Sequence, residues 1–150
     1  MSVSNPQPAT AHRNDPAVVR RLLATPGRWA VVGLSANRSR VAYGIAAYVR
    51  DLLGQQIVAV HPRAEPVHGA PAYARLADVP GHVDVVDVFV RSELAGAIVD
   101  EAIAIGAGAV WLQLGVVDAA AAARATAAGL DVVMDTCPAF EAPRLGLVTP

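Results

Sequence analysis

The chain has 150 residues, 54% of them hydrophobic, and a formal net charge of −1. This length suits one domain with a full core and leaves little room for a second. The balanced charge argues against nucleic acid as a partner, because such proteins carry a basic stripe. Cys137 is the only cysteine, which excludes an internal disulfide and a cysteine-based zinc site.

The first residues have loop composition and lack the apolar core of a signal peptide. No apolar run approaches the roughly 20 residues that cross a bilayer. We therefore expect a cytoplasmic protein with no membrane contact. Its organisation is predicted as a flexible N-terminal tail over 1–14, followed by a single domain over 15–150.

Along this domain, short β-branched runs alternate with longer stretches of helical periodicity. Asp15-Pro16 is typical of a helix N-cap followed by proline at the first helical position, and predicts a helix over 16–24. Further helical periods cover 45–53 and 94–105, and Asp118 caps an alanine-rich helix over 119–128. The strands are predicted at 29–32, 57–60, 83–90, 109–112 and 131–134.

Repeated β-α-β units with right-handed crossovers favour a parallel sheet covered by helices on both faces. We predict an α/β fold, a Rossmann-like three-layer sandwich with a five-stranded parallel sheet in the order 3-2-1-4-5. The connection over 62–82 is long, and a single helical turn near 74–78 would account for it.

In an open parallel sheet, ligands bind outside the carboxyl ends of the strands, where the strand order reverses. That point is expected between the first and fourth predicted strands. The turn after the first strand is the most informative segment. Gly33 allows close backbone approach, Ser35 and Asn37 offer polar groups, and the next helix presents free N–H groups to a phosphate. Arg38 and Arg40 add positive charge.

The same turn excludes a standard dinucleotide site. Only Gly33 precedes Gly44, so the G-x-G-x-x-G motif is absent. The second strand ends in His61-Pro62-Arg63 and not in the acidic residue that holds a ribose. The P-loop motif is absent as well. The pattern therefore favours a phosphorylated nucleotide other than NAD.

Several candidate residues keep a plain structural alternative. His61 contacts a phosphate or ribose, or it caps the end of its strand. Arg63 binds a phosphate or lies at the surface, and Arg91 reaches the crevice or pairs with Glu93. Cys137 follows the fifth strand, where its thiol faces the pocket or is buried as a small apolar group.

No set of residues resembles a nucleophile with its base and orienting group. Asp84 and Asp87 lie three apart in one strand, on opposite faces, which makes a poor acid–base pair. Asp87 is expected to bond backbone N–H groups near the floor of the crevice. We predict a binding site with no catalytic residue and no metal.

Five ordered segments resemble the small bacterial and archaeal CoA-binding domain proteins. They are WAVVGLSANRSRVAYG (29–44), IVAVHP (57–62), VDVVDVFVRSE (83–93), AIAIGAGAVWLQLGVV (102–117) and GLDVVMDTCP (129–138). The resemblance implies the CoA-binding Rossmann domain that also begins the succinyl-CoA synthetase α-subunit. It implies coenzyme A or an acyl-CoA as the ligand, and no acyl-CoA synthesis, because the ligase's phosphohistidine domain has no counterpart here.

By this resemblance the cofactor lies over the first turn and the neighbouring strand ends. The candidate cofactor-binding residues are Gly33, Leu34, Ser35, Asn37, Arg38, Tyr43, Gly44, His61, Pro62, Arg63, Val90, Arg91, Gln113, Leu114, Gly115 and Cys137. The ligase has a lysine near the second strand end; this sequence has none, so Arg63 would substitute. A CoA-dependent enzyme using Cys137, a CoA-sensing regulatory subunit, and a protein partner or homo-oligomer stay open as alternatives.

Overall fold

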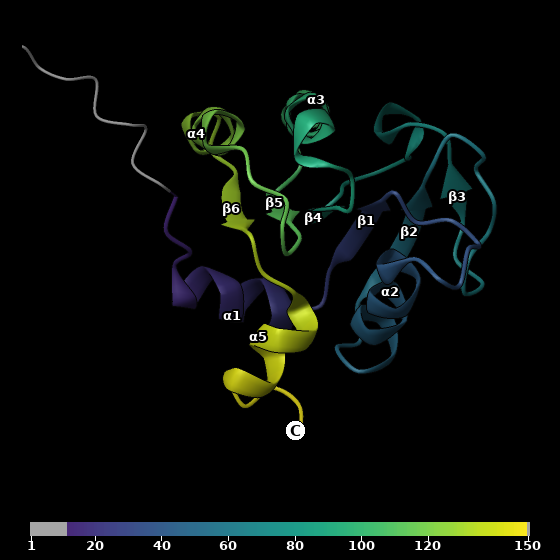
Figure 1. The fold of residues 1–150 in the computed structure, drawn as a ribbon, viewed down its shortest axis with the longest axis horizontal. Helices are drawn as coiled ribbons and strands as arrows, with labels where there is room; N and C mark the ends of the chain where they lie inside the picture. The colour runs from purple at the N-terminus through teal and green to yellow at the C-terminus, as the bar shows by residue number, and fades with distance from the viewer. Residues whose placement is uncertain (1–11, 150) are drawn as a thin grey trace, which may run out of the picture.

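A computed structural model describes residues 12–149, so most of the predicted tail lies outside the described residues. The strands form one parallel sheet between two layers of helices (Figure 1). The strands are β1 (Arg28–Val32), β2 (Gln56–Val60), β3 (Ala72–Tyr73), β4 (Val85–Val88), β5 (Ala109–Leu112) and β6 (Asp131–Met134). The helices are α1 (Pro16–Ala24), α2 (Val41–Asp51), the short 3₁₀ helix η1 (Leu76–Asp78), α3 (Ser92–Ala104), α4 (Ala119–Ala127) and α5 (Pro138–Arg144).

Apart from Asp87 in β4, the central strands are apolar on both faces because each face meets a separate core. Trp29 and Val31 of β1 pack against α1, α2 and α5, while Ala30 and Val32 face α3 and α4. This alternation explains the continuous apolar runs of the sequence, which are typical of a sheet covered on both sides. The Rossmann-like α/β fold is confirmed.

Two helix starts follow the predicted capping chemistry. The Asp15 side chain accepts from the Ala17 N–H at 2.9 Å, and the Asp118 side chain accepts from the Ala121 N–H at 3.0 Å. Both carboxylates satisfy N–H groups that have no partner within their helices. The predicted helical turn near 74–78 is also present, as η1.

The sheet has six strands, one more than predicted, in the order β3-β2-β1-β4-β5-β6. The added strand, Ala72–Tyr73, takes the edge position beside β2. The sequence had predicted the strand 83–90 at that edge and the strand 109–112 beside the first strand. Both placements are wrong. The observed β4 pairs directly with β1, so the strand order reverses between β1 and β4. A two-residue strand gives no periodic signal, and its omission displaced the others.

The chain closes with α5, which sequence periodicity did not predict. Thr136 Oγ1 donates to Glu141 Oε1 at 2.8 Å, and Trp111 Nε1 donates to the Thr136 carbonyl oxygen at 2.9 Å. At the other end, the Asn14 side chain bonds both the N–H and the carbonyl oxygen of Met134. Both ends of the described chain are thus tied to β6 and the turn that follows it.

Candidate functional site

Gly33 crosses from β1 toward α2 between two neighbouring strand ends. Its N–H donates to the Val60 carbonyl oxygen at 2.8 Å, and its φ is +100°. A Cβ at this position would lie 3.2 Å from the Phe89 carbonyl oxygen. Glycine is therefore needed by the packing of the chain itself, in addition to any ligand. Leu34 is fully buried, backbone included, so it adds no accessible surface to this edge.

The turn that follows is folded by Asn37. Its Oδ1 accepts from the Ser39 N–H at 3.0 Å and from Ser39 Oγ at 2.6 Å. The Ser35 hydroxyl accepts, at 3.3 Å, from the Asn37 N–H. These two predicted residues thus shape the turn that delivers the chain to the start of α2.

Helices α2 and α3 begin without a side-chain cap, and each has an arginine in the capping position. Arg40 precedes α2 and Arg91 precedes α3. An arginine here is unfavourable by itself, because the N-terminal end of a helix already carries partial positive charge. The same arrangement of cation and free N–H groups is favourable when an anion is bound.

Four arginines at this edge are left without a partner. Within residues 12–149, the guanidinium groups of Arg38, Arg40, Arg63 and Arg91 form no ion pair, and the predicted alternative pair of Arg91 with Glu93 is absent. Arg38 lies 6.0 Å from the centre of the Tyr43 ring, its only stacking neighbour in the described chain.

His61 takes the structural role that the sequence had left open. Its Nδ1 accepts from the Arg63 N–H at 3.1 Å, and its carbonyl oxygen accepts from the Ala64 N–H at 2.8 Å. The ring therefore closes the turn after β2 and holds the exposed Arg63 at the carboxyl end of this strand. Pro62 lies exposed in the same turn.

Asp87 and Gln113 form a buried polar pair that sequence reasoning missed. Gln113 Nε2 donates to Asp87 Oδ1 at 2.5 Å, so the predicted bond of Asp87 to backbone N–H groups is wrong. Burial raises the pKa of Asp87 to about 8, against the lowering effect of the Gln113 bond. This shift favours the protonated, neutral form of the carboxyl group at pH 7. The sheet register was needed to find the pair, because it places Asp87 opposite Trp111, two residues before Gln113.

The loop after β5 is fixed from three sides. Gln113 is held on Asp87, and the Gly115 N–H donates to Asp135 Oδ1 at 2.8 Å. Ser92 Oγ donates to the Gly115 carbonyl oxygen at 3.2 Å and accepts from the Val117 N–H at 3.0 Å. The loop is thereby preorganised beside the start of α3.

Cys137 occupies the capping position of α5 and is half-buried. Burial raises the pKa of its thiol, and this effect exceeds the lowering caused by the N–H groups of Ala139 and Phe140. A thiol with a raised pKa holds less thiolate at neutral pH and is a weak nucleophile. The position fits a residue at the margin of a site better than a reactive centre.

The remaining predicted residues lie around this edge with different exposures. Tyr43 packs on the His68 ring, with ring centres 4.2 Å apart. Gly44 is exposed on α2, with open space where a Cβ would stand, and Val90 is half-buried against the core beneath α3 and α4. Of these three, Gly44 leaves the most room for a ligand along the first turn of α2.

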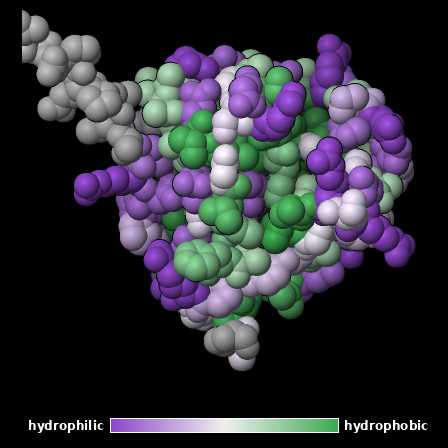
Figure 2. All heavy atoms as spheres, in the orientation of Figure 1, coloured by the Kyte–Doolittle hydropathy of each residue, from purple (hydrophilic) through white to green (hydrophobic). Residues whose placement is uncertain are grey.

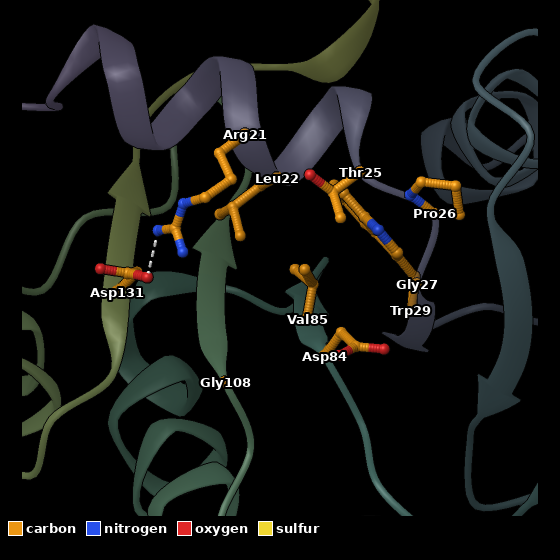
Figure 3. A pocket seen from close by; sticks show the side chains of 10 residues that line it. All are labelled: Arg21, Leu22, Thr25, Pro26, Gly27, Trp29, Asp84, Val85, Gly108 and Asp131. Atoms are coloured by element: carbon orange, nitrogen blue, oxygen red, sulfur yellow. Dashed lines mark hydrogen bonds and ion pairs between the residues drawn. The ribbon is translucent and has the colours of Figure 1, made fainter.

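The opposite edge of the sheet contains a cavity of about 180 Å³ beneath α1 (Figure 3). Arg21 and Asp131 form an ion pair at the side of this cavity, with 2.5 Å between Arg21 Nη2 and Asp131 Oδ2, as the dashed line shows. Asp84 Oδ2 accepts from the Arg28 N–H at 2.8 Å. Arg21 and Asp131 neutralise each other, and Asp84 is hydrogen-bonded to the backbone, so the polar side chains of this cavity are already engaged.

A model of the CoA binding domain matches residues 27–143. The chain belongs to this CoA-binding domain family. The match covers every strand and the helices α2 to α4, and it includes the uncapped turns described above. The resemblance predicted from the sequence segments is confirmed, and with it CoA binding as the general property of the family.

Two proteins of similar size resemble this chain over most of its length. The chain is 31% identical over 121 residues to the uncharacterized protein YneT of Bacillus subtilis (strain 168), covering 81% of this chain and 89% of the relative. A hypothetical protein from Pyrococcus horikoshii OT3 has a similar structure, with a TM-score of 0.81 and 31% identity. The match covers 89% of this chain and 96% of that one.

A larger enzyme contains a similar domain. The dinucleotide forming acetyl-coenzyme A synthetase 1 of Ca. Korarchaeum cryptofilum, solved with phosphate and ADP, matches with a TM-score of 0.63 and 25% identity. The match covers 76% of this chain but only 26% of the synthetase. Among the described residues, no helix is long and apolar enough to span a membrane.

Proposed function

We propose that this protein binds coenzyme A at the carboxyl edge of its sheet and catalyses no reaction of its own. The observation that carries the proposal is the set of four arginines without ion pairs beside two uncapped helix starts. Coenzyme A has a pyrophosphate and a 3′-phosphate, and arginines with helix N–H groups are the usual partners of such anions. The family match supplies the identity of the nucleotide.

In this proposal, each part of coenzyme A contacts the segment that follows a different strand. The pyrophosphate meets the first turn of α2 with Arg38 and Arg40. The 3′-phosphate meets Arg63, which the His61 turn holds after β2. The pantetheine arm runs toward the fixed loop of Gln113 and Gly115, past Val90 and Arg91. We place this role in the cytoplasm, which agrees with a free thiol at Cys137.

Calorimetric titration with coenzyme A, 3′-dephospho-CoA and NAD tests this proposal. We expect coenzyme A to bind most tightly and NAD to give no measurable heat. The variant Arg63→Gln should lose roughly tenfold in affinity for coenzyme A, the size of one hydrogen bond to a charged group. Its affinity for 3′-dephospho-CoA should be unchanged, because the partner of Arg63 is then absent from the ligand.

Arg124→Gln is the matched control. Arg124 is also an exposed arginine, but it pairs with Asp100 at 2.9 Å between α4 and α3 and does not lie at the end of β2 with Arg63. Its substitution should leave both affinities unchanged. The absence of heat with coenzyme A at millimolar concentration would overturn the proposal. Equal losses in Arg63→Gln and Arg124→Gln would refute the assignment of Arg63.

A reaction at Cys137 is the alternative function, and the raised pKa of the thiol speaks against it. Mass spectrometry after exposure to oxidised coenzyme A measures a mixed disulfide directly, with Cys137→Ser as the control. We expect an unmodified protein. A stoichiometric adduct that is absent in Cys137→Ser would favour the thiol-handling enzyme, and copurification of a partner only without coenzyme A would favour the sensor.

A further inference from the structure

The exposed large apolar side chains are unevenly distributed over the described residues. Those with the highest exposure are Leu114 at 73%, Val41 at 71% and Phe140 at 62%. Val41 begins α2, Leu114 follows β5, and Phe140 lies in the first turn of α5. All three therefore stand on segments that follow the carboxyl end of a strand, at the edge proposed to hold coenzyme A.

The other exposed members reinforce this distribution. Leu94 lies in the first turn of α3, and Val117 lies in the same loop as Leu114. Only Leu52, which follows the end of α2, lies at the opposite edge. Figure 2 looks onto the carboxyl edge and shows apolar residues gathered in the middle of the face, with hydrophilic residues around them.

Leu114 is held in this exposed position by the structure around it. The residue before it is bonded to Asp87 at 2.5 Å, and the residue after it is bonded to Asp135 and Ser92. An exposed leucine on a loop tied at both neighbours is preorganised for contact, which lowers the entropic cost of binding an apolar group.

Charge complementarity identifies the occupant of this apolar surface. The arginines without ion pairs lie on the same edge, at 38, 40, 63 and 91, so the edge as a whole suits a molecule with an anionic head and an apolar tail. A second copy of this chain suits it poorly, since a two-fold contact would bring the arginines of both copies together.

We infer that the physiological ligand is an acyl-CoA with an apolar acyl chain, and that Leu114, Phe140 and Val117 contact this chain. The inference rests on the proposed function, because the phosphates must lie at α2 for the thioester end to reach the loop after β5. Free coenzyme A would then bind through its head alone and leave these side chains exposed.

The test compares the affinities of coenzyme A, acetyl-CoA and octanoyl-CoA for the whole protein by calorimetry. Full burial of one methylene tightens binding about fourfold. Octanoyl-CoA should therefore bind at least about tenfold more tightly than acetyl-CoA even when its chain is only partly covered. In Phe140→Ser this preference should fall to about threefold or less, while the affinity for coenzyme A should be unchanged. Leu114→Ser should also reduce the ratio of the octanoyl-CoA affinity to the acetyl-CoA affinity. Both affinities are measured on the same variant, so a change in coenzyme A binding itself cancels from the ratio.

Leu52→Ser is the control, since it removes another exposed leucine, 60% accessible, from the other edge and should keep the full preference. Equal affinities for octanoyl-CoA and acetyl-CoA, with coenzyme A still bound, would overturn this inference and leave the proposed function intact. Failure of all three ligands to bind would overturn both. If Leu114→Ser converts a dimer to a monomer in sedimentation and leaves the ratio unchanged, the surface is an interface between copies, and the inference is wrong.

Discussion

The two edges of the sheet differ in how their polar groups are satisfied. At the amino edge, Gln55 accepts from the Gly27 N–H at 2.7 Å and donates to the carbonyl oxygens of Leu23 and Thr25. Arg21 and Asp131 neutralise each other beside the cavity of Figure 3. At the carboxyl edge, Arg40 and Arg91 stand at helix starts and form no ion pair with an acidic side chain of residues 12–149.

This difference separates stability from function within one fold. Buried or paired polar groups contribute to folding, whereas a cation left at a helix start weakens the free protein slightly. A hollow alone would point to the amino edge, where the half-open cavity beneath α1 lies. Unsatisfied charge points to the carboxyl edge, and the family match agrees with the latter.

The largest expected effect concerns Asp87, the buried acid beneath the carboxyl edge. Its pKa is about 8 in the folded protein, above the ordinary value near 4. Between about pH 4 and 8 the unfolded chain loses this proton and the folded protein keeps it, so stability falls as pH rises, by at most about 1.4 kcal/mol for each pH unit. The protonated Asp87 therefore makes its full contribution to the unfolding free energy below about pH 4, and this contribution is lost above about pH 8.

Asp87→Asn supplies a neutral group of the same shape, whose oxygen still accepts from Gln113. The variant should therefore lack this fall and be more stable than the wild type at pH 8, by up to about 5 kcal/mol. Urea unfolding at pH 5 and pH 8 measures the difference. Parallel stability curves for the two proteins would show that Asp87 is ionised in the folded state.

The next largest effect is expected when positive charge is removed from the carboxyl edge. The double variant Arg38→Gln/Arg40→Gln removes two cations from the start of α2 and should lower the affinity for coenzyme A about 100-fold, or roughly 3 kcal/mol. The unfolding free energy of the ligand-free protein should stay the same or rise, because both guanidinium groups are exposed. An affinity within about threefold of wild type would move the phosphates away from α2.

Gly33→Ala perturbs the turn through its backbone. The φ of +100° and the Phe89 carbonyl oxygen 3.2 Å from the new Cβ should cost about 2 kcal/mol of stability. Gly44→Ala is the matched control, because its Cβ would meet nothing within 4 Å in a helix and should raise stability by up to about 1 kcal/mol. Thermal or urea unfolding of both variants measures these opposite signs. Equal effects would refute the steric account of Gly33.

The smallest effect is expected from a variant that gives the uncapped helix α2 an acidic N-cap. Arg40→Asp introduces into α2 the cap that Asp15 and Asp118 supply to α1 and α4. The ligand-free protein should gain about 1 kcal/mol in unfolding free energy, and the affinity for coenzyme A should fall. Stability and affinity that change in the same direction would contradict the idea that α2 is left uncapped for an anion.

The sequence was sufficient for the fold class and for most of the elements. Its apolar runs and the caps at Asp15 and Asp118 are local signals, and the structure confirms them. The position of β4 beside β1 was not accessible, because the edge strand Ala72–Tyr73 is too short to leave a pattern. Helix α5 was missed for a similar reason: it has seven residues, two of them proline.

Only part of the candidate site could be predicted. Gly33, Arg38 and Arg63 were proposed from the sequence because they lie in the segments that follow predicted strands. The bond between Asp87 and Gln113 depends on the register of two strands, which no single segment contains. The exposure of Leu114 and Phe140 could not be predicted either. An apolar residue near a predicted strand or helix is assigned to the core until the surrounding packing is known.

The central claim is that coenzyme A binds at the carboxyl edge, and amide chemical shifts report this location most directly. A ¹H–¹⁵N NMR titration of the uniformly labelled protein with coenzyme A follows both edges in one experiment. We predict that the largest shifts occur at 33–42 and 113–117, with no significant change at the amino-edge residues 25–27 and 106–108. Shifts concentrated at the amino edge, around the cavity beneath α1, would contradict the account.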